Sequence, residues 1–135
     1  TLPRTLIHND FNPRNIALRR TKDGLRLCAY DWELAALGVP QHDLAELLCF
    51  VLTPEHAKQE VLNYLEMHRL ALQQSTGQVV DPYSWRLGFK LSLYDLILNR
   101  LPMYAMVHTF RRQRFLPRVI GTLRAMYELF PYEPE

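Results

Sequence analysis

The feature that most constrains the fold is a pair of short apolar runs joined by a turn signal. Residues 15–19 and 25–30 are rich in small and branched apolar side chains, and residues 23–24 between them read Asp-Gly. An Asp-Gly step between two such runs is a strong signal for a β-hairpin. The hairpin would place Asn15, at the start of its first strand, beside Asp31, at the end of its second.

Two proline-containing signals predict where long helices begin. Thr53-Pro54 and Asp81-Pro82 each join a residue suited to the N-cap to a proline suited to the first helical position. The first helix is expected to reach about residue 74, before Gly77, and the second to end or bend at Pro102. The expected inward residues are Val61, Leu62, Leu65 and Leu72 on the first helix, and Leu87, Leu91, Tyr94, Leu98 and Leu101 on the second.

The flanking segments are also expected to be largely helical. After a loop that runs from Glu33 through His42, Asp43 is expected to cap a buried helix ending near Leu52. A last helical segment covers about residues 110–130. The sequence therefore predicts one α+β domain over the whole chain, mostly α, with a short hairpin and four or five helices.

Composition narrows the class of protein. The chain has 48% hydrophobic and 22% charged residues, as ordinary globular proteins do, and its net charge of +2 indicates no charge-driven partner. No apolar run approaches the length of a membrane span. Cys28 and Cys49 lie in apolar surroundings, which predicts free thiols and a reducing, cytoplasmic compartment. We interpret the basic run Arg111, Arg112 and Arg114 as a solvated surface.

The residues suited to chemistry gather in three short motifs. The sequence reads His8-Asn9-Asp10-Phe11-Asn12-Pro13-Arg14-Asn15-Ile16, then Tyr30-Asp31-Trp32-Glu33, then Gly38-Val39-Pro40-Gln41-His42-Asp43-Leu44-Ala45. In this order and spacing they resemble the aminoglycoside phosphotransferase and choline kinase family, kinase-like enzymes that phosphorylate small molecules. The resemblance covers about residues 4–52 and implies the C-terminal lobe of a protein-kinase-like fold.

The nucleotide lobe of that family precedes the first motif, where this chain has only residues 1–5. The five glycines of the chain are scattered and form no phosphate-covering loop, and no Lys precedes Asp10. We therefore expect a C-terminal lobe that is inactive alone and works with an upstream nucleotide lobe of the same polypeptide.

The resemblance assigns roles to three residues around the first motif. Phosphoryl transfer asks a protein mainly to position the reactants and to neutralise charge. Asp10 would orient the acceptor hydroxyl and take its proton, and His8 would brace the loop through hydrogen bonds. Asp43 would hold the backbone of this catalytic loop.

The resemblance also implies ATP as the phosphoryl donor and Mg2+ as its companion ion. Asn15 and Asp31 stand at the family's metal-ligand positions, and amide and carboxylate oxygens are ligands that Mg2+ prefers. The predicted hairpin supports this assignment because it brings both residues to one edge of the strand pair.

The phosphoryl acceptor is expected to be a small molecule that resembles an aminoglycoside, choline or a sugar. Trp32 and Glu33 would suit a cationic amine or a sugar, through attraction to the ring face and ion pairing. Tyr94 and Asp95 are further candidates for acceptor binding, although Trp32 and Tyr94 are equally well explained as core aromatics. Neither nucleic acid nor a membrane is expected as a partner.

Three other interpretations stay open. His8 and Asp10 would suit a metallohydrolase, but a catalytic zinc site usually needs a third ligand. The remaining histidines show no paired spacing: His42, His56, His68 and His108. The chain would otherwise be a non-catalytic binding module, or a lobe completed by a partner chain that docks on exposed apolar residues. The candidate docking residues are Leu2, Leu6 and Phe11.

Overall fold

The structure is a computed structural model in which residues 2–131 are described. Its elements are β1 (Thr5–Ile7), β2 (Ile16–Thr21), β3 (Gly24–Ala29), β4 (Ala36–Gly38), α1 (Gln41–Val51), α2 (Pro54–Thr76), α3 (Pro82–Asp95), α4 (Leu101–Phe110) and α5 (Leu116–Glu128). A 3-10 turn, Trp32–Leu34, precedes β4, and a π-helical turn, Leu96–Arg100, joins α3 to α4. The predicted class, α+β and mostly helical, is confirmed.

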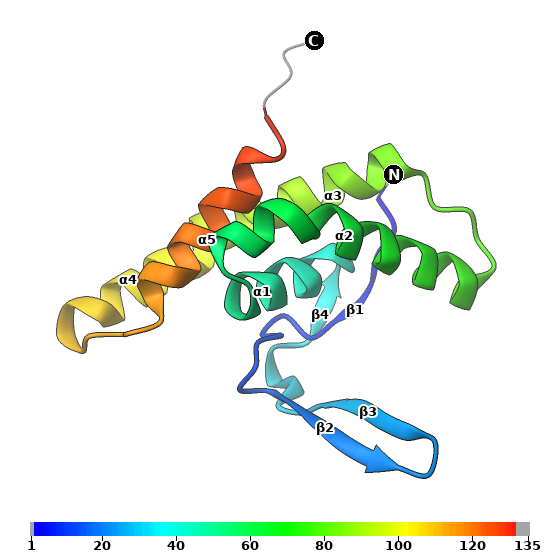
Figure 1. Cartoon of the computed structure of the whole chain (residues 1–135), viewed down its shortest axis with the longest axis horizontal. Coiled ribbons are helices and arrows are strands. Elements are labelled where there is room, and N and C mark those ends of the chain that lie inside the picture. The colour runs from blue at the N-terminus through cyan, green and yellow to red at the C-terminus, as the bar shows by residue number, and fades with distance from the viewer. Residues whose placement is uncertain (1, 132–135) are drawn as a thin grey trace.

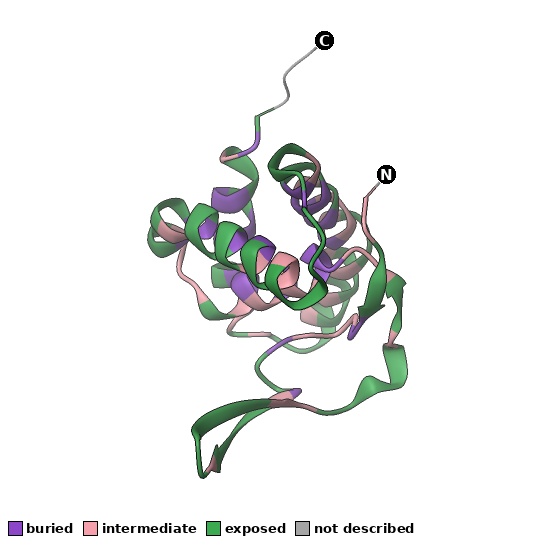
Figure 2. Ribbon diagram, turned by 90° about the vertical axis from the view of Figure 1, so that its right-hand side faces the viewer, coloured by how far each residue is buried: buried purple, intermediate pink, exposed green. Residues whose placement is uncertain are grey.

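The core lies among helices α1, α2, α3 and α5, and the strands lie to one side of it (Figure 1). Figure 2 shows the buried residues on the facing sides of the helices. The apolar side chains buried in this core include Trp85, Phe89, Leu93, Val61, Leu65 and Met126. The indole of Trp85 also donates a hydrogen bond to the Leu65 carbonyl at 3.0 Å, so its polar atom is satisfied inside the core.

The predicted inward stripe of α3 is wrong at three of its five positions. Leu87, Leu91 and Leu98 are 40%, 46% and 71% exposed, whereas Trp85 and Phe89 are almost completely buried. Apolar residues occupy two faces of this segment, and their spacing alone does not say which face meets α1. On α2 the same ambiguity placed Leu62 inward, but it is 42% exposed.

The helix starts at Thr53 and Asp81 are confirmed. The Thr53 hydroxyl accepts a hydrogen bond from the His56 amide, and the Asp81 carboxylate accepts one from the Ser84 amide. Gly77, with φ of 69°, ends α2 in the left-handed conformation that glycine adopts without strain. Near Pro102 the α-helical pattern gives way to the π-helical turn, because proline has no amide hydrogen to donate to residue 98.

Helix α1 begins before its predicted cap. It starts at Gln41, and no side chain caps its first amides. The prediction of Asp43 as N-cap is wrong because its carboxylate instead accepts hydrogen bonds from the backbone of residues 8 and 9. Asp43 remains in the first turn of α1, where a negative charge is favourable.

The predicted hairpin is confirmed as β2 and β3. The two strands pair antiparallel from Ile16 opposite Ala29 to Thr21 opposite Gly24, and residues 22–23 make the turn. The Tyr30 amide then donates to the Asn15 carbonyl at 3.0 Å, so the pairing continues to the expected site residues. The hairpin projects away from the helical body (Figure 1).

Part of the segment expected to be a loop is a strand. Residues Ala36–Gly38 form β4 and pair antiparallel with β1, an element about thirty positions earlier in the chain. A Cβ atom on Gly38 would lie 2.5 Å from Ile7 Cδ1, so a larger residue at this position would require the Ile7 side chain to move. Three residues carry too little pattern for this strand to be predicted locally.

Candidate active site

The loop between β1 and β2 is fastened to α1 by two carboxylates. Asp43 accepts hydrogen bonds from the amides of His8 and Asn9, at 2.7 and 2.9 Å, and Glu46 accepts one from the Phe11 amide at 2.8 Å. Asn9 has a φ of 62°, a left-handed conformation that Asn tolerates better than most residues. Hydrogen bonds to ionised acceptors are stronger than neutral ones, so α1 fixes the backbone on both sides of Asp10.

Neighbouring side chains hold the carboxylate of Asp10 in a defined orientation. Its Oδ1 accepts from the Asn12 amide group at 3.0 Å, and its Oδ2 accepts from that of Asn15 at 2.7 Å. An Arg100 nitrogen lies 3.6 Å from Oδ1, and the Asp10 side chain is 21% exposed. The acid is thus oriented by three partners and still reaches solvent.

His8 joins this loop to the base of the hairpin. Its ring is 1% exposed, and its Nε2 lies 2.8 Å from the Tyr30 carbonyl. A carbonyl only accepts, so Nε2 carries the proton and donates it. The ring also packs against Trp32, with centroids 4.7 Å apart. His8 therefore braces the loop.

The amide of Asn15 has one orientation that its neighbours allow. Its nitrogen contacts the Asp10 carbonyl at 2.9 Å and the Asp10 carboxylate at 2.7 Å, and both are acceptors. The side-chain oxygen of Asn15 is consequently turned away from Asp10. Asp31 follows the hairpin on an exposed stretch and has a left-handed φ of 64°.

A family model described as "APH: Phosphotransferase enzyme family" matches residues 1–83. This match covers more than half of the chain and includes the loop, the hairpin and α1. The chain belongs to the phosphotransferase enzyme family. No curated protein and no solved structure matched it.

The family match gives the loop and hairpin a chemical context. In a phosphotransferase, hard oxygen ligands near the acid are suited to the magnesium ion that accompanies a nucleotide. Asn15 and Asp31 stand at the end of one strand pair and carry an amide oxygen and a carboxylate, which are donor types that Mg2+ accepts. Among residues 2–131, no three or more His, Cys, Asp and Glu side chains form a metal-binding cluster.

The residues considered for acceptor binding do not form one group. Trp32 is 47% exposed and donates from its indole to the Ala29 carbonyl at 3.1 Å, and Glu33 beside it is exposed. Asp95 lies on α3, with one oxygen 3.5 Å from His42 Nδ1. Tyr94 packs edge-on against Tyr127 of α5, with centroids 5.6 Å apart.

His42 and Asp95 line an open groove between the β1–β4 pair and α3, together with Asn9 and Ser92. Burial lowers the pKa of His42 below its usual value, although the nearby charges of Asp95 and Asp43 oppose this shift. The ring is therefore neutral at pH 7, and its contact with Asp95 is a polar contact rather than an ion pair. Its Nε2 is buried and has no hydrogen-bond partner within the described residues.

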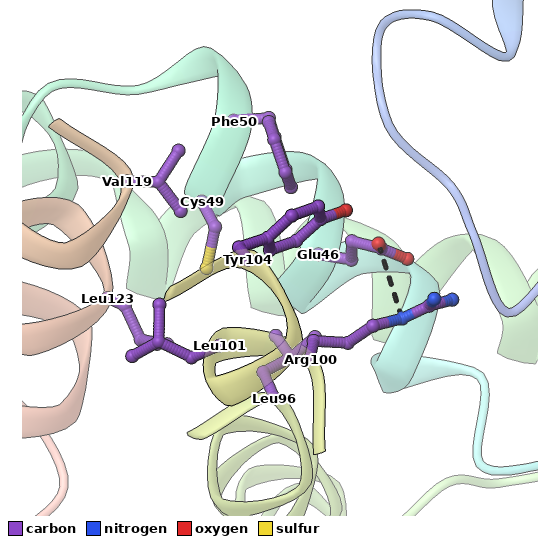
Figure 3. Close-up of a pocket in the computed structure, with 9 residues that line it drawn as sticks. All are labelled: Glu46, Cys49, Phe50, Leu96, Arg100, Leu101, Tyr104, Val119 and Leu123. Atoms are coloured by element: carbon purple, nitrogen blue, oxygen red, sulfur yellow. Dashed lines mark ion pairs between the residues drawn. The ribbon is translucent and has the colours of Figure 1, made fainter. Parts of the chain in front are cut away.

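Three residues that the sequence did not single out complete the geometry. Asn12 is fully buried and links Asp10 to the Arg14 amide. Glu46 and Arg100 face each other beside the loop (Figure 3). The sequence does contain one indication of Glu46, because it is an acid inside the apolar run of residues 44–52. It contains none of Arg100, because Arg100 is separated from Asp10 by ninety positions.

Within residues 2–131, no helix combines the length and the apolar character that crossing a bilayer requires.

Proposed function

We propose that this chain is the acceptor-binding half of a phosphotransferase that moves the γ-phosphoryl group of ATP to a hydroxyl of a small molecule. The observation that carries the proposal is the support of Asp10. Two side-chain amides orient its carboxylate, and α1 holds the backbone on both sides of it. An acid held in this way is suited to orient a hydroxyl and to receive its proton.

Asn15 and Asp31 are proposed to hold the Mg2+ ion that accompanies the nucleotide. The ion, when bound, would neutralise charge on the phosphate oxygens. The contribution of the protein is the placement of the two oxygen donors. A hydrogen bond to Asp10 fixes the Asn15 amide. Asp31 follows β3, and the end of β3 pairs with the start of β2 beside Asn15.

The acceptor is proposed to be a small polar or cationic molecule in the aminoglycoside, choline or sugar range. Exposed Trp32 and Glu33 offer a ring face and a negative charge next to Asp31. Asp95 offers a second negative charge in the groove beside Asn9. Tyr94 is a weaker candidate, because its ring is engaged with Tyr127.

The nucleotide is proposed to be held largely by a separate lobe. The 135 residues contain no glycine-rich phosphate loop, and no helix or strand of residues 2–131 covers the hairpin that would lie under a nucleotide. We further propose a cytoplasmic location, which agrees with the free thiols of Cys28 and Cys49.

The test is Mg·ATP-dependent phosphorylation of an amine and sugar panel by the natural polypeptide that carries this chain. Asp10→Asn and Asp31→Asn are each expected to lower turnover by about 100-fold or more, the usual range for loss of a general base or of charge stabilisation. Asp23→Asn, in the hairpin turn, is the matched control and should retain full turnover. Unchanged turnover in either site variant would contradict the proposal. Mg·ATP binding without any phosphorylated product would favour a binding module.

A further inference from the structure

Arg100 lies ninety positions after Asp10 in the sequence, and its side chain contacts the loop. It is the last residue of the π-helical turn, in which the Leu101 amide donates to the Leu96 carbonyl. A π-helical turn contains one more residue than an α-helical turn, so it redirects the side chains that follow by roughly a quarter of a turn. Such turns are frequent at functional sites. Arg100 stands at the end of this turn, and its side chain reaches Asp10.

The guanidinium of Arg100 meets three oxygen-bearing groups. It lies 3.6 Å from Asp10 Oδ1 and 3.9 Å from Glu46 Oε1, and it also donates a hydrogen bond to the Asn9 carbonyl. The side chain is only 17% exposed. A planar guanidinium with five donors is suited to such a position, because it can serve several acceptors without changing its own geometry.

The second carboxylate of this group is a buried acid. The Glu46 side chain is 1% exposed, and its Oε1 makes no hydrogen bond within the described part of the chain. Figure 3 shows that its neighbours on the other side are the apolar lining of a small cavity, including Cys49 and Phe50. Burial raises the pKa of Glu46, and the positive charge of Arg100 opposes that rise.

A buried acid with an unbonded oxygen is unfavourable for stability unless a charge compensates it. Arg100 provides that charge, and Glu46 in turn bonds the Phe11 amide beside the acid. The pair therefore connects α1, the π-helical turn and the loop. Packing alone would be satisfied equally well by an uncharged residue at either position, so the pair is better explained by its effect on the loop.

We propose that Arg100 is a positioning residue for phosphoryl transfer, which holds Asp10 and the Asn9 carbonyl in place through its anchorage on Glu46. The catalytic part of this inference rests on the proposed function. The mechanical part does not, since Arg100 would order the loop whether or not Asp10 acts on a substrate.

The first measurement is hydrogen exchange of the natural polypeptide, read in the peptide covering residues 9–12. Arg100→Gln should speed exchange there by about tenfold or more, the effect expected from losing hydrogen bonds to a charged group. Arg100→Lys should give a smaller increase in the exchange rate, because lysine keeps the positive charge but lacks the planar guanidinium group with its several donors. Arg114→Gln removes the same charge from an exposed loop and is the control. In this variant the peptide covering residues 9–12 should exchange at the original rate.

Glu46→Gln tests the anchor separately. This variant keeps an acceptor for the Phe11 amide and removes only the charge that faces Arg100. It should speed exchange in the same peptide, and combining it with Arg100→Gln should add less than the sum of the two single effects. A double-variant effect equal to the sum of the two single effects would overturn the anchoring role of Glu46. Thermal unfolding of each variant confirms that the comparison is made on folded protein.

Turnover provides the readout that a purely structural role would not move. Arg100→Gln should lower kcat by about tenfold or more with little change in the KM for ATP, and Arg100→Lys should recover part of the loss. Unchanged exchange and unchanged kcat in Arg100→Gln would overturn the proposal. If the unaltered polypeptide yields no phosphorylated product, the proposed function fails. The exchange results then still decide whether Arg100 positions the loop.

Discussion

The loop and the hairpin supply the two sides of the candidate site, and they are held in opposite ways. The loop around Asp10 is bonded to α1 through Asp43 and Glu46, and its side chains satisfy one another. Among the described residues, the strands of the hairpin pair only with each other, and Leu18, Leu25 and Leu27 are 66%, 63% and 54% exposed. The proposed base is therefore positioned by the helical body, whereas Asp31 is positioned by a much softer element.

The strand register places the leucines of the hairpin on one face, which they share with Arg20 opposite Leu25. Leu18 lies opposite Leu27, and Leu25 lies on the same face two positions along β3. The other face carries Arg19 and Arg26, which lie opposite each other. A two-stranded hairpin alone is marginally stable in water, so a segment that covered this face would add order to the hairpin side of the site.

The largest expected effect tests the rigid side. Phe89→Ala should lower the free energy of unfolding by about 3–5 kcal/mol, because it empties a fully buried position in the core that supports α1. Leu87→Ala, on the exposed face of the same helix, is the control and should cost much less. Urea unfolding at pH 7 measures both. Equal losses would show that the burial assigned to α3 is wrong.

A smaller effect is expected where the loop meets α1. Asp43→Ala removes the acceptor of the His8 and Asn9 amides and should lower the free energy of unfolding by about 2–3 kcal/mol, as for hydrogen bonds to a charged group. Glu33→Ala, at an exposed acid, should have little effect. A variant that unfolds like the unaltered protein would mean that the loop is held by other contacts.

A pH-dependent effect should follow from the buried histidine of the groove. Burial lowers the pKa of His42 in the folded protein, so below about 6.5, the ordinary value, the unfolded chain binds more protons at this position. The stability contribution of neutral His42 is complete above that pH and is lost as the pH falls toward the lowered pKa. His42→Gln should therefore show a shallower loss of unfolding free energy between pH 7 and pH 5.

His68 is half-buried and burial also lowers its pKa, so the His42→Gln variant should keep part of this pH dependence. Urea unfolding at several pH values measures the difference in slope. An identical slope in both proteins would show that folding does not change the pKa of His42.

The smallest expected effect tests the soft side. Leu27→Thr should change the free energy of unfolding by no more than about 0.5 kcal/mol, because this side chain already lies in water and Thr suits a strand. Leu18→Thr should behave in the same way. A loss near 2 kcal/mol in the natural polypeptide would show that another segment covers the leucine face, and would remove the contrast between the two sides.

Features carried by neighbouring residues could be predicted from the sequence. The turn at residues 22–23 and the starts at Thr53 and Asp81 depend on local backbone preferences, and all three are as expected. The hairpin also brought Asn15 next to Tyr30, one position before Asp31. Strand pairing alone therefore brings Asn15 next to the residue that precedes Asp31.

Features that depend on distant partners could not be predicted. Strand β4 exists because β1 pairs with it, and Asp43 leaves the cap position because two amides of the loop need an acceptor. The burial of α3 is decided by the elements packed against it, where Gly88 allows Gln41 to approach. Arg100 and Glu46 acquire their significance only when α1 and the π-helical turn meet.

Asn9 and Asp31 are the two non-glycine residues with positive φ among those described. Asn9 directly precedes Asp10, the proposed catalytic acid, and Asp31 is itself a proposed metal ligand. Left-handed backbone costs a non-glycine residue roughly 1 kcal/mol, so glycine at either position would relieve strain. A selection for heat resistance alone would therefore favour Asp31→Gly and remove a proposed metal ligand. Variants chosen for durability should lose this acid early, and natural sequences that retain it would do so under selection for activity.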